Sequence, residues 1–357
     1  MLELVTEKQT VWEYLSRTEK PILLYGMGDG ADKILRVFSN YGIVCSGIFA
    51  SDEFVRGHSF RGFRVMTYAQ ACETYPDCIV VLAFAAFTDE LRGKICRIAE
   101  ERELYAPDVP VVGTELFTLE YLRAKEASLQ EVYHMLADEQ SKRVFADVIN
   151  FKLSGKVDYL EQATTSVDEI YHDILPPESN EVYLDLGAYN GDTVREFLSY
   201  APDCERIIAA EPDIRNYRKL EKYIEENGLR QVEARNIGVW DSAGVMHFDR
   251  RAGRNSAISQ NAKTEVMVDS IDGILGGGRV TTVKMDVEGA ERQAISGGIK
   301  TLRQYAPKLI IAAYHRTGDF FELPLLIKEI NPNYQIYLRH HPYIPAWETN
   351  LYAKICR

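Results

Sequence analysis

The stretch VYLDLGAYNGDTV, residues 182–194, predicts a buried strand that runs into a glycine turn and then into a helix. The apolar run contains a carboxylate, Asp185, and is followed by two glycines, Gly187 and Gly191. Glycine tolerates the sharp backbone turn that links a strand to a helix in an α/β sheet. Ligands of such sheets bind beyond the carboxyl ends of the strands. The turn is therefore the first candidate ligand site.

The same alternation of strands and helices continues from this stretch to the end of the chain. Helical segments follow the first, second, fourth and fifth strands, whereas the short link HHPYIPAWE joins the last two. A link this short indicates an antiparallel hairpin at one edge of an otherwise parallel sheet. The predicted strands are 181–187, 206–212, 233–240, 281–287, 308–315, 335–339 and 349–355.

The part of the chain before this region predicts a second, smaller α/β unit. PILLYG at 21–26 precedes a glycine-rich turn and a helix, and CIVVLAFAAF at 78–87 is a further buried strand. Between them and the larger unit, apolar residues recur at three- and four-residue steps, which is typical of amphipathic helix, until Pro176 and Pro177. The predicted fold class is α/β, with Rossmann-like domains at 1–118 and 179–357 and a helical connector at 119–178.

Charge and composition exclude several classes of function. The chain has 41 basic and 53 acidic residues, a net charge of −12 that repels a phosphate backbone and disfavours nucleic acid as substrate. Its six cysteines have no spacing typical of a zinc site or a disulfide framework. The start of the chain lacks the pattern of a signal peptide, and the most apolar window is too short to cross a bilayer. We expect a cytoplasmic protein with no membrane span.

The carboxylate at the turn indicates the ligand. Asp185 would repel a pyrophosphate, but it suits the ammonium and sulfonium groups of S-adenosylmethionine. Glu211, at the end of the next strand, is placed to accept hydrogen bonds from ribose hydroxyls, and the third strand ends where an adenine edge would lie. The predicted cofactor-binding residues are Asp185, Gly187, Ala188, Tyr189, Gly191, Asp192, Thr193, Glu211, Pro212, Asn236, Ile237 and Gly238.

Five sequence blocks in order resemble the FkbM-type family of S-adenosylmethionine-dependent methyltransferases. They are YLDLGAYNGDT (183–193), AAEPD (209–213), RNIGVWDSAGVMHF (235–248), VKMDVEGAERQAISG (283–297) and PKLIIAAYHR (307–316), and they cover roughly half of the chain. The resemblance implies a seven-stranded class I methyltransferase fold. It also implies methyl transfer to an oxygen of a small molecule or a sugar.

Two side chains at neighbouring strand ends are the predicted catalytic residues, Asp286 and His315. Histidine titrates near neutral pH, so His315 is the predicted general base, and Asp286 would orient it or the acceptor. Mg²⁺ is an alternative that Asp286, Glu288 and Glu291 leave open, and no metal ligand is assigned. Glu288 is interpreted instead as a cap of the helix that follows.

Polar residues near the last hairpin form a predicted rim for the acceptor. These are Arg339, His340, His341 and Glu348, with Asn255 and Ser256 in the loop after the third strand as further substrate-binding candidates. Such a rim would suit a hydroxylated or anionic acceptor such as a sugar. For His340 and His341, surface positions in a turn are an equally good interpretation.

The glycine turn of the N-terminal unit supports an alternative function. Gly26, Gly28 and Ala31 nearly match the dinucleotide fingerprint, and the unit is similar to small nucleotide-sugar-binding domains. Asp29 within the turn would oppose a pyrophosphate, so a scaffold without a ligand is weighed equally. The alternative is a nucleotide-sugar- or NAD-binding protein, or an oxidoreductase, led by this unit. The sequence leaves open whether the chain forms a homo-oligomer.

Overall fold

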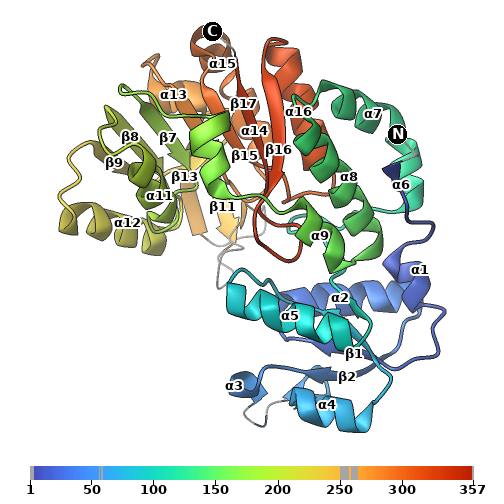
Figure 1. The fold of residues 1–357 in the computed structure, drawn as a ribbon. Coiled ribbons are helices and arrows are strands. Elements are labelled where there is room, and N and C mark those ends of the chain that lie inside the picture. Colours follow the sequence, from blue (N-terminus) through green and yellow to red (C-terminus); the bar gives the residue numbers. More distant parts are fainter. Residues whose placement is uncertain (1–3, 56, 58, 250–256, 259–263, 356–357) are drawn as a thin grey trace.

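The computed structural model describes residues 4–55, 57, 59–249, 257–258 and 264–355. Figure 1 shows a smaller α/β unit built from the N-terminal part of the chain, in blue and cyan, below a larger α/β unit built from the C-terminal part, in yellow to red. Green helices from the middle of the chain lie between and beside them. No helix among the described residues is long and apolar enough to span a membrane.

The smaller unit contains a six-stranded sheet in the order β3-β4-β2-β1-β5-β6. Both faces of its central strands are apolar and covered, which explains why β1 and β5 are continuous hydrophobic runs. Helices α1 and α2 pack on one face, and α4 and α5 pack on the other. The elements are α1 (Val11–Leu15), β1 (Ile22–Tyr25), α2 (Asp29–Tyr41), β2 (Cys45–Phe49), α3 (Asp52–Val55), β3 (Ser59–Phe60), β4 (Phe63–Met66), α4 (Tyr68–Thr74), β5 (Ile79–Leu82), α5 (Asp89–Glu101) and β6 (Leu104–Tyr105).

The larger unit contains a seven-stranded sheet in the order β16-β17-β15-β14-β7-β8-β9. All neighbours are parallel except β17, which is antiparallel to both β15 and β16. The predicted fold class is therefore confirmed, including the hairpin at one edge. The strands are β7 (Val182–Leu186), β8 (Arg206–Ala210), β9 (Val232–Arg235), β14 (Thr282–Met285), β15 (Lys308–Ala312), β16 (Gln335–His340) and β17 (Thr349–Lys354).

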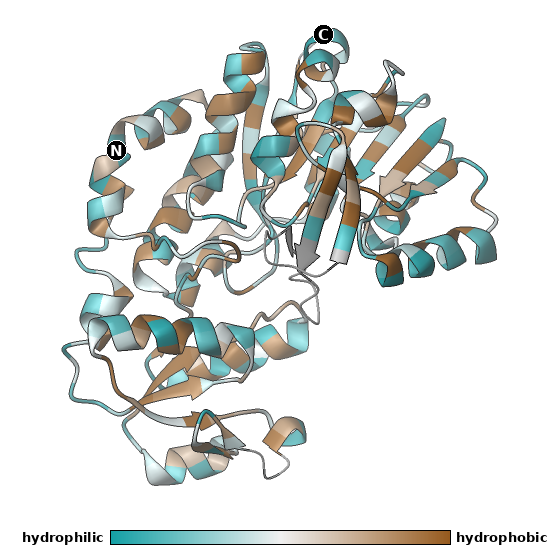
Figure 2. Cartoon of the chain, turned by 180° about the vertical axis from the view of Figure 1, so that it is seen from behind, coloured by the Kyte–Doolittle hydropathy of each residue, from teal (hydrophilic) through white to brown (hydrophobic). Residues whose placement is uncertain are grey.

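Helices cover this sheet on both sides, and its strands are mainly hydrophobic (Figure 2). On one face α11 packs with the turn of π-helix, and on the other α14 to α16 pack with α7 and α8. These helices are α6 (Leu119–Ala124), α7 (Glu126–Met135), α8 (Glu139–Ser154), α9 (Val157–Ala163), α10 (Val167–Glu169), the π-helix Ile170–Ile174, α11 (Asp192–Tyr200), α12 (Ile214–Glu226), α13 (Ile271–Leu275), α14 (Glu291–Ser296), α15 (Ile299–Tyr305) and α16 (Asp319–Ile330).

The helices of the expected connector pack mainly in the core of the larger sheet. Leu129, Val144 and Val148 lie in one cluster with residues of β7 and β14, whereas Phe151, Val157 and Leu160 lie in a core of the smaller sheet. The division at 118 and 178 stays a prediction.

The third predicted strand, 233–240, is wrong as a single element. Its first half is β9 of the main sheet, and its second half is β10 (Gly238–Val239) of a separate four-stranded sheet in the order β10-β13-β11-β12. The chain turns at Asn236, whose Nδ2 donates to the Glu211 carbonyl at 2.8 Å and the Pro212 carbonyl at 3.1 Å. The other strands of the small sheet are β11 (Gly244–Asp249), β12 (Ala257–Ile258) and β13 (Thr264–Asp269).

Candidate active site

A cavity of about 600 Å³ opens at the carboxyl ends of the central strands of the larger sheet. It lies where the strand order reverses between β14 and β7, the position at which open α/β sheets bind ligands. Its walls come from the turn after β7, from the ends of β8, β14 and β15, and from the loop between β16 and β17. Residues of the N-terminal part of the chain close one side.

The turn after β7 needs glycine because the backbone at the end of the neighbouring strand in the sheet, β14, lies against it. Gly187 has a φ of +84°, and a Cβ built on it would lie 1.9 Å from the carbonyl oxygen of Asp286. Tyr189 is also left-handed, with a φ of +46°. Its N–H donates to Oε2 of Glu211 at 2.9 Å, which ties the turn to the end of β8. The turn then runs directly into the amino-terminus of α11.

Asp185 is completely buried below this turn and does not line the cavity. It accepts a hydrogen bond from the Thr193 hydroxyl, and its Oδ1 lies 3.3 Å from Nζ of Lys284. Burial raises the pKa of Asp185, and Lys284 counteracts this effect. The prediction that Asp185 contacts the cofactor directly therefore needs correction, because its charge is already paired below the turn.

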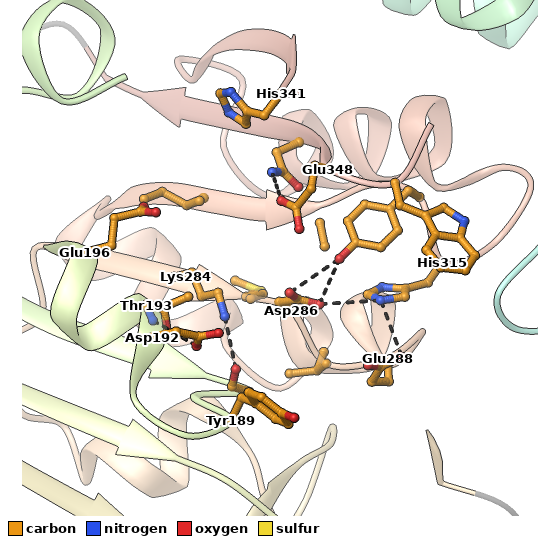
Figure 3. A pocket seen from close by; sticks show the side chains of 18 of the residues that line it. Tyr189, Asp192, Thr193, Glu196, Lys284, Asp286, Glu288, His315, His341 and Glu348 are labelled. Atoms are coloured by element: carbon orange, nitrogen blue, oxygen red, sulfur yellow. Dashed lines mark hydrogen bonds and ion pairs between the residues drawn. The ribbon is translucent and has the colours of Figure 1, made fainter. Parts of the chain in front are cut away.

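Lys284 is a site residue that the sequence reasoning missed. Its Nζ donates to the Gly187 carbonyl at 3.1 Å, and its side chain lines the cavity (Figure 3). Burial alone would lower the pKa of Lys284, but the carboxylates of Asp185, Asp286 and Asp192 raise it above its ordinary value. The available signal was a lysine between Val283 and Met285 inside a predicted buried strand, since a charge is buried only with a partner.

Glu211 lies where the sequence predicted it, at the end of β8 and on the cavity wall. Its Oε1 accepts the Asp213 N–H at 2.8 Å, and burial raises its pKa to about 7. The predicted cofactor residues that line the cavity are Gly187, Tyr189, Asp192, Thr193, Glu211, Pro212, Ile237 and Gly238. Those that do not line it are Asp185, Ala188, Gly191 and Asn236.

His315 is surrounded by three carboxylates, two of which, Asp286 and Glu288, are labelled in Figure 3. Its Nδ1 lies 2.8 Å from Oε1 of Glu291, and its Nε2 lies 3.4 Å from Asp286 and 3.6 Å from Glu288. Burial would lower the pKa of His315, but the charge and hydrogen bond of Glu291, together with Asp286 and Glu288, raise it to about 10. An imidazolium has no lone pair for a proton. These contacts favour a charged imidazole that positions the neighbouring carboxylates, and the role of His315 as general base stays a prediction.

Asp286 and Glu288 face the cavity beside this imidazolium. The Tyr314 hydroxyl lies 3.4 Å from each carboxylate oxygen of Asp286, whose side chain is 34% exposed. Burial raises the pKa of Glu288 to about 8, although His315 acts in the opposite direction. The interpretation of Glu288 as a helix cap is wrong. Glu291 holds that turn instead, by accepting the Val287 N–H at 3.0 Å.

Asp286, Glu291 and His315 each place one potential ligand atom within 4.8 Å of the others. This donor set fits Mg²⁺ poorly, because Mg²⁺ prefers oxygen ligands and retains several waters. His315 and Glu291 are 2% and 1% exposed and are hydrogen-bonded to each other. The ion pair between His315 and Glu291 accounts for the cluster.

Two of the predicted acceptor residues are structural, which corrects their assignment. Arg339 is 1% exposed and bridges Asp138 at 2.7 Å and Glu169 at 2.8 Å. His340 lies between the Thr349 hydroxyl and the Tyr343 carbonyl, and burial lowers its pKa to about 3.

The remaining acceptor candidates differ in position. His341 and Glu348 line the cavity, and their role in binding the acceptor stays a prediction. Nδ1 of His341 lies 3.0 Å from the Thr165 carbonyl, and its Nε2 lies 2.6 Å from the Tyr352 hydroxyl. Asn255 and Ser256 lie outside the residues that the structure describes.

Packing explains two glycines of the N-terminal turn, Gly26 and Gly30, whereas Gly28 has open space around it and a φ of +101°. A Cβ on Gly26 would lie 2.5 Å from the Phe84 ring, and one on Gly30 would lie 2.3 Å from the Ala83 carbonyl. The segment after β5 therefore covers the turn closely. Nζ of Lys33 lies 3.3 Å from Asp29 and donates to the Val111 carbonyl at 2.9 Å. Nucleotide binding at this turn stays a prediction.

Comparison with known proteins agrees with this geometry. Residues 185–345 match the family model of the methyltransferase FkbM domain. The chain is similar in fold to the crystal structure of methyltransferase FkbM from Methylobacillus flagellatus KT, with a TM-score of 0.72, 20% identity, and coverage of 98% of this chain and 94% of that one.

Other solved structures match only part of the chain. An rRNA methylase from Streptococcus thermophilus matches with a TM-score of 0.34 and 12% identity, over 56% of this chain and 93% of that one. Aeropyrum pernix fibrillarin, in complex with natively bound S-adenosyl-L-methionine, matches with a TM-score of 0.32 and 12% identity, over 50% of this chain and 67% of that one. No curated protein sequence matches the chain.

Proposed function

We propose, on the premise that residues 185–345 form an FkbM-type methyltransferase domain, that the chain transfers a methyl group from S-adenosylmethionine to a hydroxyl of a small molecule or a sugar. The observation that carries the proposal is one cavity with two ends. The glycine turn and Glu211 form one end, and the carboxylates of Asp286 and Glu288 form the other.

The first end suits a positively charged nucleoside. Glu211 is placed to accept hydrogen bonds from ribose hydroxyls, because its oxygens face the turn and keep lone pairs beyond the two backbone N–H groups they accept. Asp192 and Glu196 lie one helical turn apart on α11 and add negative charge to the wall. Bound there, S-adenosylmethionine would supply an activated methyl group as electrophile.

The second end suits proton removal from the acceptor. As the new carbon–oxygen bond forms and the carbon–sulfur bond breaks, the hydroxyl proton passes to a carboxylate of this chain. We assign this role to Glu288, whose pKa of about 8 lies near a neutral operating pH. Asp286 orients the hydroxyl, and the His315 imidazolium fixes both carboxylates. Holding acceptor and donor in line supplies the rest of the rate enhancement.

Calorimetry with S-adenosylhomocysteine tests the cofactor site. We expect saturable binding by the wild-type protein and at least tenfold weaker binding by Glu211→Ala, because the ribose loses its acceptor. Glu225→Ala, an exposed acid on α12, is the matched control and should bind like the wild type. Absence of heat with the wild-type protein, or equal affinity for both variants, would contradict the proposal.

A further inference from the structure

The cavity is not built by the methyltransferase domain alone. Phe87, Asp89 and Val111, all from the N-terminal part of the chain, line it together with the loop between β16 and β17. Phe87 lies in the segment that follows β5, and Asp89 is the first residue of α5. The carboxyl end of the smaller sheet therefore faces the carboxyl end of the larger one across the cavity.

Backbone hydrogen bonds hold this N-terminal wall in place. The Ala86 N–H donates to the Ile344 carbonyl at 2.7 Å, and the Ile344 N–H donates to the Ala86 carbonyl at 2.9 Å. Both residues are buried. This isolated bridge joins two loops more than 250 residues apart in sequence, so the wall is part of the folded site.

Aromatic rings from both parts of the chain form a row on this wall. The Phe87 and Tyr343 rings are stacked, with centroids 5.9 Å apart and planes at 22°. Trp347 extends the row, 6.1 Å from Tyr343. Phe87 is 53% exposed and lines the cavity, so its ring is accessible to a ligand. Aromatic faces carry negative charge density and attract C–H groups or cations that lie over them.

The cavity that this row lines is rich in carboxyl groups. Asp89, Asp286, Glu288 and Glu348 all line it. Among the described lining residues, the Lys284 ammonium contacts Asp185 and the His315 imidazolium contacts Glu291, so neither cation is available to bind an anion from the acceptor. The described lining residues therefore favour an acceptor without a phosphate or carboxylate group over an anionic one.

We infer that the segment 86–89 forms one wall of the acceptor site, and that the acceptor is a hydroxylated ring without negative charge, either a neutral sugar or an amino sugar. The ring would lie on Phe87, Tyr343 and Trp347, and carboxylates would accept hydrogen bonds from its hydroxyls or pair with its ammonium group. Phe87 is then a specificity-determining residue supplied by the N-terminal part. The inference rests on the proposed function.

The test measures formation of S-adenosylhomocysteine from S-adenosylmethionine with a panel of neutral hexoses, hexosamines and hexose phosphates. We expect turnover with members of the first two groups and none with the phosphates. For an accepted sugar, Phe87→Ala should raise KM at least tenfold and leave the Kd for S-adenosylhomocysteine within twofold, and Phe87→Tyr should restore KM. Phe54→Ala removes an equally exposed ring of the N-terminal part that does not line the cavity, and should behave as the wild type.

Each other outcome identifies what fails. If the protein binds S-adenosylhomocysteine but methylates no neutral or amino sugar, or prefers the phosphates, the inference is overturned and the proposed function stands. An unchanged KM for Phe87→Ala overturns the role of the N-terminal wall. If S-adenosylhomocysteine itself does not bind, the proposed function is what fails.

Discussion

Glu288 is held in a backbone conformation that a glutamate rarely adopts, with a φ of +53°. Non-glycine residues in this region cost free energy and persist where the surrounding structure enforces them, commonly at functional sites. Here the conformation turns the carboxylate toward the cavity and His315, while Glu291, three residues later, caps the turn below. The backbone conformation thus directs the Glu288 carboxylate into the cavity, whereas the Glu291 carboxylate caps the turn.

The raised pKa of Glu288 predicts how the rate depends on pH. A general base must be ionised, so the fraction of active enzyme should rise as pH increases through about 8. We expect kcat/KM to rise over this range and to level off above it. Glu288→Gln should lower kcat by roughly 10²- to 10⁴-fold, the typical contribution of a general base, and abolish this rising limb.

The control for this prediction is the Kd for S-adenosylhomocysteine, which should change less than threefold in Glu288→Gln. A variant that keeps the wild-type pH profile and turnover would show that another group takes the proton, with Asp286 the next one to replace.

Side-chain roles could be predicted from the sequence only where the strand end itself fixes them. Glu211 and Asp286 close apolar strands, and both line the cavity. The protonation of His315 depends on three carboxylates that meet only in the folded chain. The role of Arg339 depends on residues more than 150 positions away in the sequence. Its guanidinium forms ion pairs with Asp138 and Glu169.

The turn between β7 and α11 is the element on which the site depends most. It touches β14 through Gly187, β8 through Tyr189 and Lys284 through the Gly187 carbonyl. Three strands are thus joined at one tight turn, which is why its glycine is a packing requirement as well as a conformational one.

Substitution of this glycine separates the two requirements. Gly187→Ala adds a methyl group 1.9 Å from the Asp286 carbonyl in a left-handed conformation, so β7 and β14 must move apart. Gly228→Ala is the matched control, since its φ is +60° and nothing lies within 4 Å of the added Cβ. It should cost about 1–2 kcal/mol, the usual penalty for a left-handed alanine.

We expect Gly187→Ala to lower the free energy of unfolding by clearly more than the control and to abolish S-adenosylhomocysteine binding. Denaturant unfolding and calorimetry measure the two effects. Equal losses of stability in both variants would mean that the turn relaxes without disturbing β14.

Elements with strong periodicity were predictable, whereas short ones were not. The seven strands of the larger sheet follow from apolar runs and their spacing, including the antiparallel hairpin. The break of 233–240 into β9 and β10 arises from the hydrogen bonds of Asn236 to the loop after β8, a tertiary contact with no local signal. The alternation of polar and apolar residues in TEVMVD is typical of a strand and could have revealed β13. Its antiparallel pairing with β11 was harder to predict, because the residues between these two strands in the sequence are mostly polar.

The two parts of the molecule share helix α8. Its residues Val144 and Val148 pack in the core of the larger sheet, whereas Phe151 packs in a core of the smaller one. The chain after β6 returns to this helix, where the Ala106 N–H donates to the Gly155 carbonyl at 2.7 Å. A cavity wall made by both parts requires that they hold a fixed relative position, and α8 provides it. We therefore expect the two parts to unfold together.

The ion pair between Lys152 and Asp108 tests this coupling, because it lies where α8 meets the N-terminal part. Nζ of Lys152 is 2.9 Å from Oδ2 of Asp108, and the side chains are 4% and 6% exposed. Lys152→Met leaves a buried carboxylate without its partner, which typically costs about 3–5 kcal/mol. Urea unfolding followed by circular dichroism should show one transition with a lowered midpoint. The double variant Lys152→Met, Asp108→Leu should recover part of the lost stability, because no charge remains buried.

Lys142→Met removes an exposed ion pair of the same helix and should leave the midpoint unchanged. Two separate transitions, with only one shifted by Lys152→Met, would show that α8 does not couple the parts, and the shared cavity wall would then lack its support.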